Sequence, residues 1–105
     1  MSLRTPLAAE QVRQRLADTG WSGDTVEIRR AFSVDYDTAI RIVGEVGRAA
    51  IELEHRPDID IRWDTLSFTM TTHTAGDVVT ELDFQLAERI NAIAHGHGAR
   101  PVSNS

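Results

Sequence analysis

Apolar residues near the start of the chain repeat at helical spacing. Val12 and Leu16 lie four positions apart, as residues on one face of a helix do. Thr5 and Pro6 suit the start of this helix, because threonine caps helices and proline is tolerated in the first turn. Gly20 suits its end, where a left-handed backbone conformation is common. The pattern therefore predicts a first helix that begins near the proline and ends at the glycine.

Two later stretches alternate apolar and polar residues, which is typical of half-buried strands. The first runs from Thr25 to Val34, and a shorter strand around Trp21 would pair with it through the turn Ser22-Gly23-Asp24. The second runs from Ile59 to Trp63 and, after a break, from Leu66 to Met70. We therefore expect two pairs of antiparallel strands.

A helix is predicted after each strand pair. Asp35 suits the N-cap of the second helix, and Pro57 should end it near His55, because proline disfavours helical geometry in the preceding residue. Its expected apolar stripe comprises Tyr36, Ile40, Val43, Gly47 and Ala50, widened by Ala39, Val46 and Leu53. The last helix should begin at Thr80, with Asp83 at capping-box spacing. Its apolar side comprises Leu82, Leu86, Ile90 and Ile93.

The order of the predicted elements is α-β-β-α-β-β-α. Strand pairs separated by a helix, without strict βαβ alternation, favour an α+β fold with a four-stranded antiparallel sheet and its helices packed on one face. We expect one domain over residues 1–95. Residues 96–105 are rich in Gly, Ser and Asn, and we expect them to form a disordered C-terminal tail.

Composition and charge exclude several classes of protein. The chain has 105 residues, a net charge of −5 and no cysteine. The acidic balance argues against general nucleic-acid binding, which needs a basic surface. The absence of cysteine excludes disulfides and thiolate metal sites. No apolar run is long enough for a membrane span, and Met1 to Pro6 lacks the apolar stretch of a secretory signal. We expect a cytoplasmic protein that binds neither nucleic acid nor membranes.

Three features carry candidate chemistry at the ends of predicted elements. They are the segment Glu54-His55-Arg56-Pro57, the residue His73 and the residue Asp83. Each also has a structural interpretation: His55 as a cation at a helix C-terminus, His73 as an exposed strand-end residue, and Asp83 as a capping carboxylate. Two histidines and a carboxylate suit general acid–base catalysis near neutral pH. No pair of histidines has the spacing of a zinc site within one element, so we expect no metal.

The segment from Ala50 to Asp83 resembles the pterin-4a-carbinolamine dehydratase family. That family reads Glu-x-x-x-His-His-Pro, then an aromatic residue, then a histidine ten residues later, then an aspartate in the next helix. The corresponding residues here are Ile51, His55-Arg56-Pro57, Trp63, His73 and Asp83. The runs from Pro57 to Trp63 and from Thr71 to Gly76 also look like family sequence. The order of elements agrees from the first helix to Ala94.

The resemblance implies dehydration of a 4a-hydroxytetrahydropterin to the quinonoid dihydropterin without a cofactor, as in tetrahydrobiopterin recycling. His55 and His73 would flank the 4a-hydroxyl group as acid and base. Asp83 would orient a histidine or bind the pterin ring. Pro57 would shape the pocket, and Trp63 would pack near it.

Two positions depart from the family pattern. Arg56 replaces the second histidine, and a guanidinium cannot release a proton at neutral pH. It can still donate hydrogen bonds to the pterin or to the departing hydroxide. Ile51 replaces the glutamate of the helix. The alternative function is therefore a catalytically weak or inactive family member that acts as a protein-binding or assembly factor, and a third is a pocket for another planar, more anionic ligand.

We expect the chain to form a homodimer or homotetramer. A sheet needs its edges covered, and Gly44 and Gly47 permit close approach of another helix. The family resemblance also implies dimers and tetramers.

Overall fold

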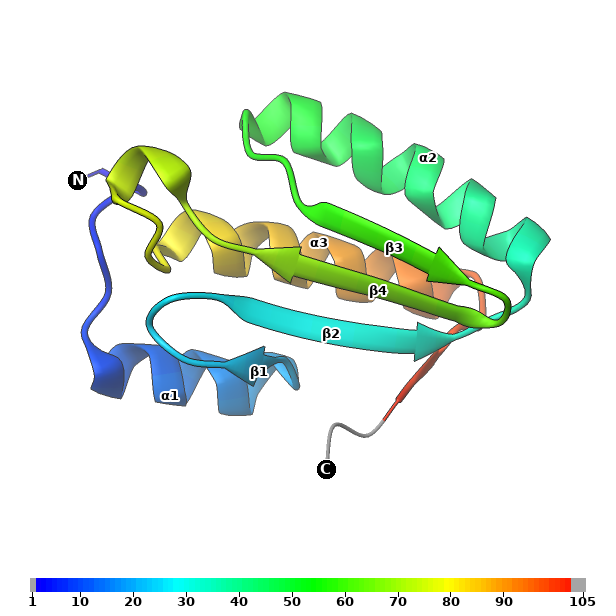
Figure 1. Ribbon diagram of the computed structural model, residues 1–105, viewed down its shortest axis with the longest axis horizontal. Helices are drawn as coiled ribbons and strands as arrows, with labels where there is room; N and C mark the ends of the chain where they lie inside the picture. Colours follow the sequence, from blue (N-terminus) through cyan, green and yellow to red (C-terminus); the bar gives the residue numbers. More distant parts are fainter. Residues whose placement is uncertain (1, 103–105) are drawn as a thin grey trace.

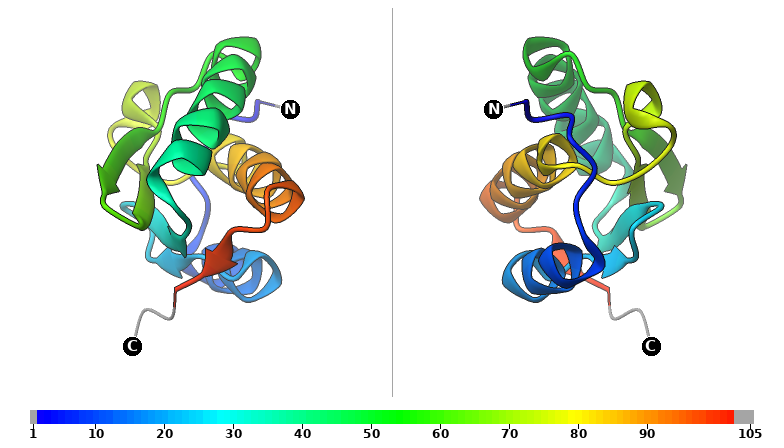
Figure 2. Two further views of the ribbon diagram at one scale, coloured as in Figure 1. Left: turned by 90° about the vertical axis from the view of Figure 1, so that its right-hand side faces the viewer. Right: turned by 90° about the vertical axis from the view of Figure 1, so that its left-hand side faces the viewer.

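The computed structural model describes residues 2–102. Its helices are α1 (Ala9–Thr19), α2 (Tyr36–Leu53) and α3 (Glu81–Gly96), with one 3₁₀ turn, η1 (His73–Ala75). Its strands are β1 (Ser22–Gly23), β2 (Ile28–Ser33), β3 (Asp58–Arg62), β4 (Thr65–Met70) and β5 (Arg100–Pro101). All three α-helices lie on one face of the sheet, as Figure 2 shows, and the α+β prediction is confirmed.

The sheet has the order β1-β2-β4-β3, and each neighbouring pair is antiparallel. The long central strands β2 and β4 pair over their whole lengths, from Ile28 opposite Met70 to Ser33 opposite Thr65. β3 forms the edge beside β4, and α2 runs along that side of the molecule (Figure 1). This arrangement brings the end of α2 close to the turn that follows β4.

The C-terminal segment differs from the expected disordered tail. Residues 100 and 101 form β5, which pairs with Ser33 and Phe32 of β2, and Val102 N donates to Ala31 O at 2.9 Å. Gly98, with φ 76°, turns the chain back after α3, and Ala99 is buried. The prediction of disorder is therefore wrong for the residues up to 102. Residues 103–105 lie outside the described residues.

The ends of the helices follow local rules, with one exception. The Asp35 side chain accepts a hydrogen bond from Thr38 N at 3.0 Å and caps α2, as predicted. Gly20 ends α1 in the left-handed conformation, also as predicted. The start of α1 was predicted too early, because Pro6 forms a bridge to Thr80 instead of entering the helix. Segment 3–7 begins with a turn at residues 3 and 4 and runs beside the start of α3.

The side of α2 that faces the core matches the predicted stripe only in part: Ala39, Val46 and Ala50 are buried as expected, and Val43 and Leu53 pack against the core. The buried residues of α2 are Ala39, Ile42, Val46, Ala49 and Ala50. Tyr36 and Ile40, which the expected stripe placed in the core, are 55% and 47% exposed. Ile51 is 64% exposed on the same outer side. A second row of residues on α2 therefore faces away from the core. We call it the outer stripe, and it comprises Tyr36, Ile40, Gly44, Gly47 and Ile51.

Among the described residues, no helix is both long and apolar enough to cross a membrane.

Candidate active site

His55 lies directly after the end of α2. Glu54 takes the left-handed conformation with φ 52°, and His55 N donates to Ala50 O at 3.0 Å. Pro57 follows two residues later and prevents continuation of the helix. This tight end turns the histidine side chain inward, and His55 is only 7% exposed.

Asp83 in the first turn of α3 receives that side chain. The carboxylate is fully buried, and its Oδ1 lies 2.5 Å from Nε2 of His55. Its Oδ2 accepts hydrogen bonds from Thr72 Oγ1 at 2.7 Å and from Thr80 N at 2.8 Å. The hydroxyls of Thr72 and Thr80 are themselves 2.8 Å apart. A buried carboxylate is costly unless it is hydrogen-bonded, and these contacts satisfy both of its oxygens.

This network fixes the tautomer of His55. An ionised carboxylate only accepts hydrogen bonds, so Nε2 of His55 must donate to Asp83. In the neutral ring the lone pair then resides on Nδ1. The geometry is that of a histidine oriented by a buried carboxylate, with its other nitrogen available to take a proton.

His73 begins the turn η1 and is far more exposed. Its side chain is 75% exposed, and its Nδ1 lies 2.6 Å from Oδ1 of Asp77. Asp77 takes the left-handed conformation with φ 60°, which holds its carboxylate near the start of the turn. Within residues 2–102, Nε2 of His73 makes no hydrogen bond, so it is the ring nitrogen that solvent or a ligand can reach.

A shallow pocket of about 190 Å³ joins these groups. Its lining residues are Arg4, Glu54, His55, Arg56, Thr72, His73 and Thr74. The structure thus brings together both predicted histidines and Arg56, with the Asp83 carboxylate buried behind His55. Sequence reasoning missed Thr72 and Arg4. The threonine precedes a candidate histidine and had a local signal, whereas the arginine reaches the pocket only through the fold.

The remaining predicted positions lie apart from this pocket. Pro57 is half-buried and leads from the pocket into β3. Trp63 lies in the turn at the other end of β3, about 17 Å away for a strand of this length, and is 90% exposed. The expectation that it packs near the pocket is wrong within one chain. Ile51 does not line the pocket either, so the family glutamate position lies outside it here.

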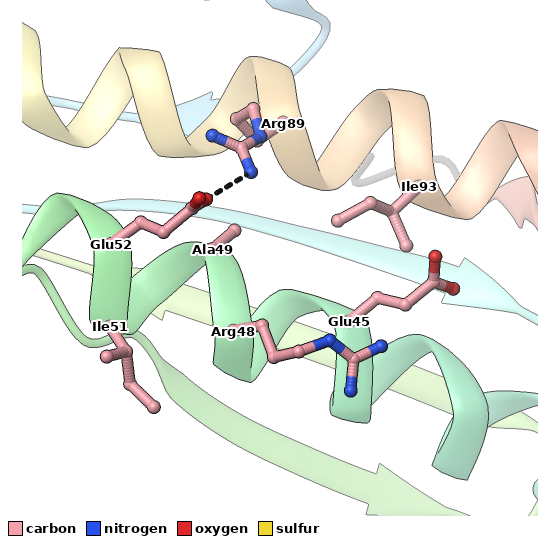
Figure 3. Close-up of a pocket in the computed structure, with 7 residues that line it drawn as sticks. All are labelled: Glu45, Arg48, Ala49, Ile51, Glu52, Arg89 and Ile93. Carbon is pink, nitrogen blue, oxygen red and sulfur yellow. Dashed lines mark hydrogen bonds and ion pairs between the residues drawn. The ribbon is translucent and has the colours of Figure 1, made fainter.

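A larger groove runs between α2 and α3 on the helical side of the molecule. It measures about 550 Å³ and is lined by Glu45, Arg48, Ala49, Ile51, Glu52, Arg89 and Ile93. Figure 3 shows Arg89 and Glu52 bridging the two helices, with 2.9 Å between Nη2 and Oε2, while Ile51 points away from α3. The groove contains charges of both signs and no histidine. Within residues 2–102, no group of three or more His, Cys, Asp or Glu residues could hold a metal ion.

Comparison with known proteins gives one consistent result. Residues 5–93 match the family model described as pterin 4 alpha carbinolamine dehydratase. A Streptomyces avermitilis protein, provisionally named as a pterin-4-alpha-carbinolamine dehydratase, is 38% identical over 90% of this chain and 95% of its own length. A Mycolicibacterium smegmatis protein with the same provisional name is 43% identical over 83% of this chain and 94% of its own. The crystal structure of a transcriptional coactivator/pterin dehydratase from Brucella melitensis superposes with a TM-score of 0.80 at 29% identity, over 86% of this chain and 99% of that one.

Proposed function

This chain belongs to the pterin-4a-carbinolamine dehydratase family, and we propose that it dehydrates a 4a-hydroxytetrahydropterin to the quinonoid dihydropterin. The observation that carries the proposal is the buried pair of His55 and Asp83, which opens onto a pocket shared with His73. Such a reaction would place the protein in tetrahydrobiopterin recycling.

The proposed reaction removes one molecule of water and involves no redox step. His55 accepts the proton of a ring nitrogen at Nδ1, and the electron pair left behind forms the new carbon–nitrogen double bond as the C4a–O bond breaks. His73 acts in its protonated form, in which Nδ1–H donates to Asp77 and Nε2–H gives its proton to the leaving hydroxyl, which departs as water. After the product leaves, the proton on Nδ1 of His55 passes to water in the pocket, and His73, which is exposed, takes up a proton from solvent.

The other polar groups support this step. Asp83 is fully buried and contacts no substrate, so we assign it a positioning role: it holds the tautomer and orientation of His55. Arg56 stays charged and donates hydrogen bonds to the pterin or to the departing hydroxide. Pro57 shapes the wall by ending α2. Trp63 has no part in the proposal for one chain, because it lies at the far end of β3.

The test is the rate of dehydration of synthetic 4a-hydroxytetrahydropterin with and without the protein. We expect acceleration by the wild type, and a loss of roughly 10²–10⁴-fold in His55→Ala and His73→Ala. His95→Ala is the matched control, because His95 is exposed at the far end of α3. Wild-type protein that gives no acceleration over the spontaneous reaction would refute the proposal.

We also propose that two copies of the chain associate through the outer stripe of α2 in a homodimer or homotetramer. Tyr36, Ile40 and Ile51 are exposed apolar side chains on one helix face, and nothing lies within 4 Å of a Cβ placed at Gly44 or Gly47. That smooth, apolar row allows a second helix to approach closely. Ile40→Glu should yield the 11.6 kDa monomer in light scattering, whereas Val26→Glu, at an exposed position outside α2, should not.

A second candidate function uses the same stripe to bind a different protein. The observation that favours it is the exposed stripe together with Arg56, which cannot act as an acid or base. The Brucella neighbour is named both as a coactivator and as a dehydratase. A protein that acts only by binding partners would neither bind pterin nor lose its biological role in His73→Ala. Pterin titration followed by intrinsic tryptophan fluorescence separates this candidate from the enzyme.

A further inference from the structure

Two arginines from distant parts of the sequence stand on the wall of the catalytic pocket. Arg56 follows α2, and Arg4 lies in a turn of the segment before α1. Nη2 of Arg4 donates to Glu54 O at 3.2 Å, which fastens the arginine to the end of α2. Neither guanidinium forms an ion pair with a carboxylate within residues 2–102, whereas the Arg15, Arg62 and Arg89 side chains do.

The segment that carries Arg4 is held in place by its backbone. Leu3 O accepts a hydrogen bond from Leu82 N at 3.2 Å, and Leu7 N donates to Val79 O at 3.1 Å. Pro6 forms a bridge to Thr80 between them. These contacts attach the segment to the start of α3, beside the buried carboxylate that orients His55. Arg4 is therefore positioned before any ligand binds, which lowers the entropic cost of using it.

The charge of the pocket wall is opposite to the charge of the chain. The chain carries −5 overall, yet the pocket lining contains two arginines and a single carboxylate residue, Glu54. The neighbouring carboxylates are already bonded, Asp83 to His55 and Asp77 to His73. The free hydrogen-bond donors of two guanidiniums suit a carboxylate or a phosphate, which each guanidinium can bind with two parallel hydrogen bonds.

We infer that the substrate is a 4a-hydroxytetrahydropterin whose side chain carries an anionic group, bound between Arg4 and Arg56. This inference rests on the proposed dehydration. The pocket, at about 190 Å³, is smaller than the usual site for a complete ligand and accommodates the ring system rather than its substituents. The substituent therefore extends to the rim, where Arg56 is exposed and Arg4 half-buried.

The experiment compares kcat/KM for three synthetic substrates that share the ring and differ in the side chain at carbon 6: neutral hydroxyalkyl, carboxylate-bearing and phosphate-bearing. We expect wild type to favour one or both anionic substrates by roughly 3- to 30-fold, the range between an exposed ion pair and a charge-assisted hydrogen bond. The preference should shrink as salt is added, because the arginines are partly exposed. The carboxylate and phosphate arms identify which anion the site takes.

Variants attribute the preference to the two arginines. Arg56→Gln and Arg4→Gln should lower kcat/KM more for the anionic substrates than for the neutral one, and Arg56→Lys should restore part of the difference. Arg62→Gln is the matched control, because Arg62 lies at the other end of β3 and should not change the ratio. Circular dichroism of each variant checks that it is folded.

The outcomes separate this inference from the proposed function. Equal acceleration of neutral and anionic substrates would overturn the anionic subsite and leave the dehydratase proposal intact. If no substrate is accelerated, the dehydratase proposal fails, and calorimetric titration with neutral and anionic pterins then decides the subsite. Tighter binding of the anionic pterins that is lost in Arg56→Gln would support it, and equal binding would overturn it.

Discussion

The C-terminal end of α2 and its outer stripe differ in which groups they bury. At the end of the helix, a histidine, a carboxylate and two threonines are buried and bonded to one another. Along the outer stripe, Tyr36, Ile40 and Ile51 remain apolar and exposed. Burying a polar group costs free energy unless the group is hydrogen-bonded. An exposed apolar patch, by contrast, is a surface that another molecule can cover. One helix thus carries the candidate active site at its end and an exposed apolar surface along its side.

The largest effect is expected from removing the carboxylate at the centre of the polar cluster. Asp83→Ala leaves His55, Thr72 and the Thr80 N–H without their acceptor, which should lower the free energy of unfolding by roughly 3 kcal/mol or more. Urea denaturation measures this loss. Asp83→Asn keeps the shape and should lower the dehydration rate more than the stability, because an amide can present its NH₂ group to His55. A loss of stability within 0.5 kcal/mol in the alanine variant would contradict the role given to the cluster.

A smaller loss is expected from Thr72→Val, which keeps the shape of the side chain and removes its hydroxyl. The hydroxyl donates to Asp83 and lies within hydrogen-bond distance of Thr80, so its loss should cost about 1–2 kcal/mol. Thermal unfolding and the dehydration rate should both be measured. Thr74→Val is the control, since Thr74 lines the same pocket but is exposed. An equal loss of stability in the two variants would show that the buried hydrogen bonds of Thr72 do not contribute more to stability than the exposed hydroxyl of Thr74.

A change at the other end of α2 should have a weaker, pH-dependent effect. Hydrogen bonds from the Thr38 side chain and backbone hold the pKa of Asp35 below its usual value. A depressed pKa contributes stability above the unfolded value, and that contribution is lost as pH falls through the folded value. Asp35→Asn should therefore lower the melting temperature at neutral pH, with the difference fading below about pH 4. A difference that stays constant down to pH 2 would contradict this assignment.

The smallest effect on the monomer is expected from Ile40→Ser in the outer stripe. Ile40 is exposed, so its replacement should change the free energy of unfolding of the isolated chain by less than about 0.5 kcal/mol. Ile42→Ser, two residues along and fully buried, is the contrast and should be strongly destabilising. Measurements at low protein concentration keep association from contributing. A large loss in Ile40→Ser under those conditions would place this residue in the core.

Local rules predicted most of the fold, because the residues that end its elements act on their neighbours. Asp35 capped α2, Gly20 ended α1, and strand alternation gave the sheet. The buried face of α2 was predicted only in part, because apolar residues occupy two adjacent sides of this helix. β5 was missed because pairing of a short Gly- and Ser-rich segment depends on an open edge of β2, which no local pattern reveals.

The site was predictable to a similar degree. The two histidines and Asp83 were marked by their places at the ends of elements and by the family resemblance. The bond from Asp83 to His55 joins residues 28 positions apart, and Arg4 reaches the end of α2 from 50 positions away. Such contacts depend on how the elements pack, so spacing alone could not reveal them. Trp63 was misassigned because residues close in sequence lie at opposite ends of an extended strand.

The course of segment 3–7 has a practical consequence for handling the protein. That segment runs beside the start of α3, and Arg4 lies on the wall of the pocket. A purification tag or fusion partner joined before this segment is only a few residues from Arg4, whereas β5 pairs with the end of β2, away from the pocket residues. Material for kinetics is therefore best produced with its tag at the C-terminus, or with an N-terminal tag cleaved before assay.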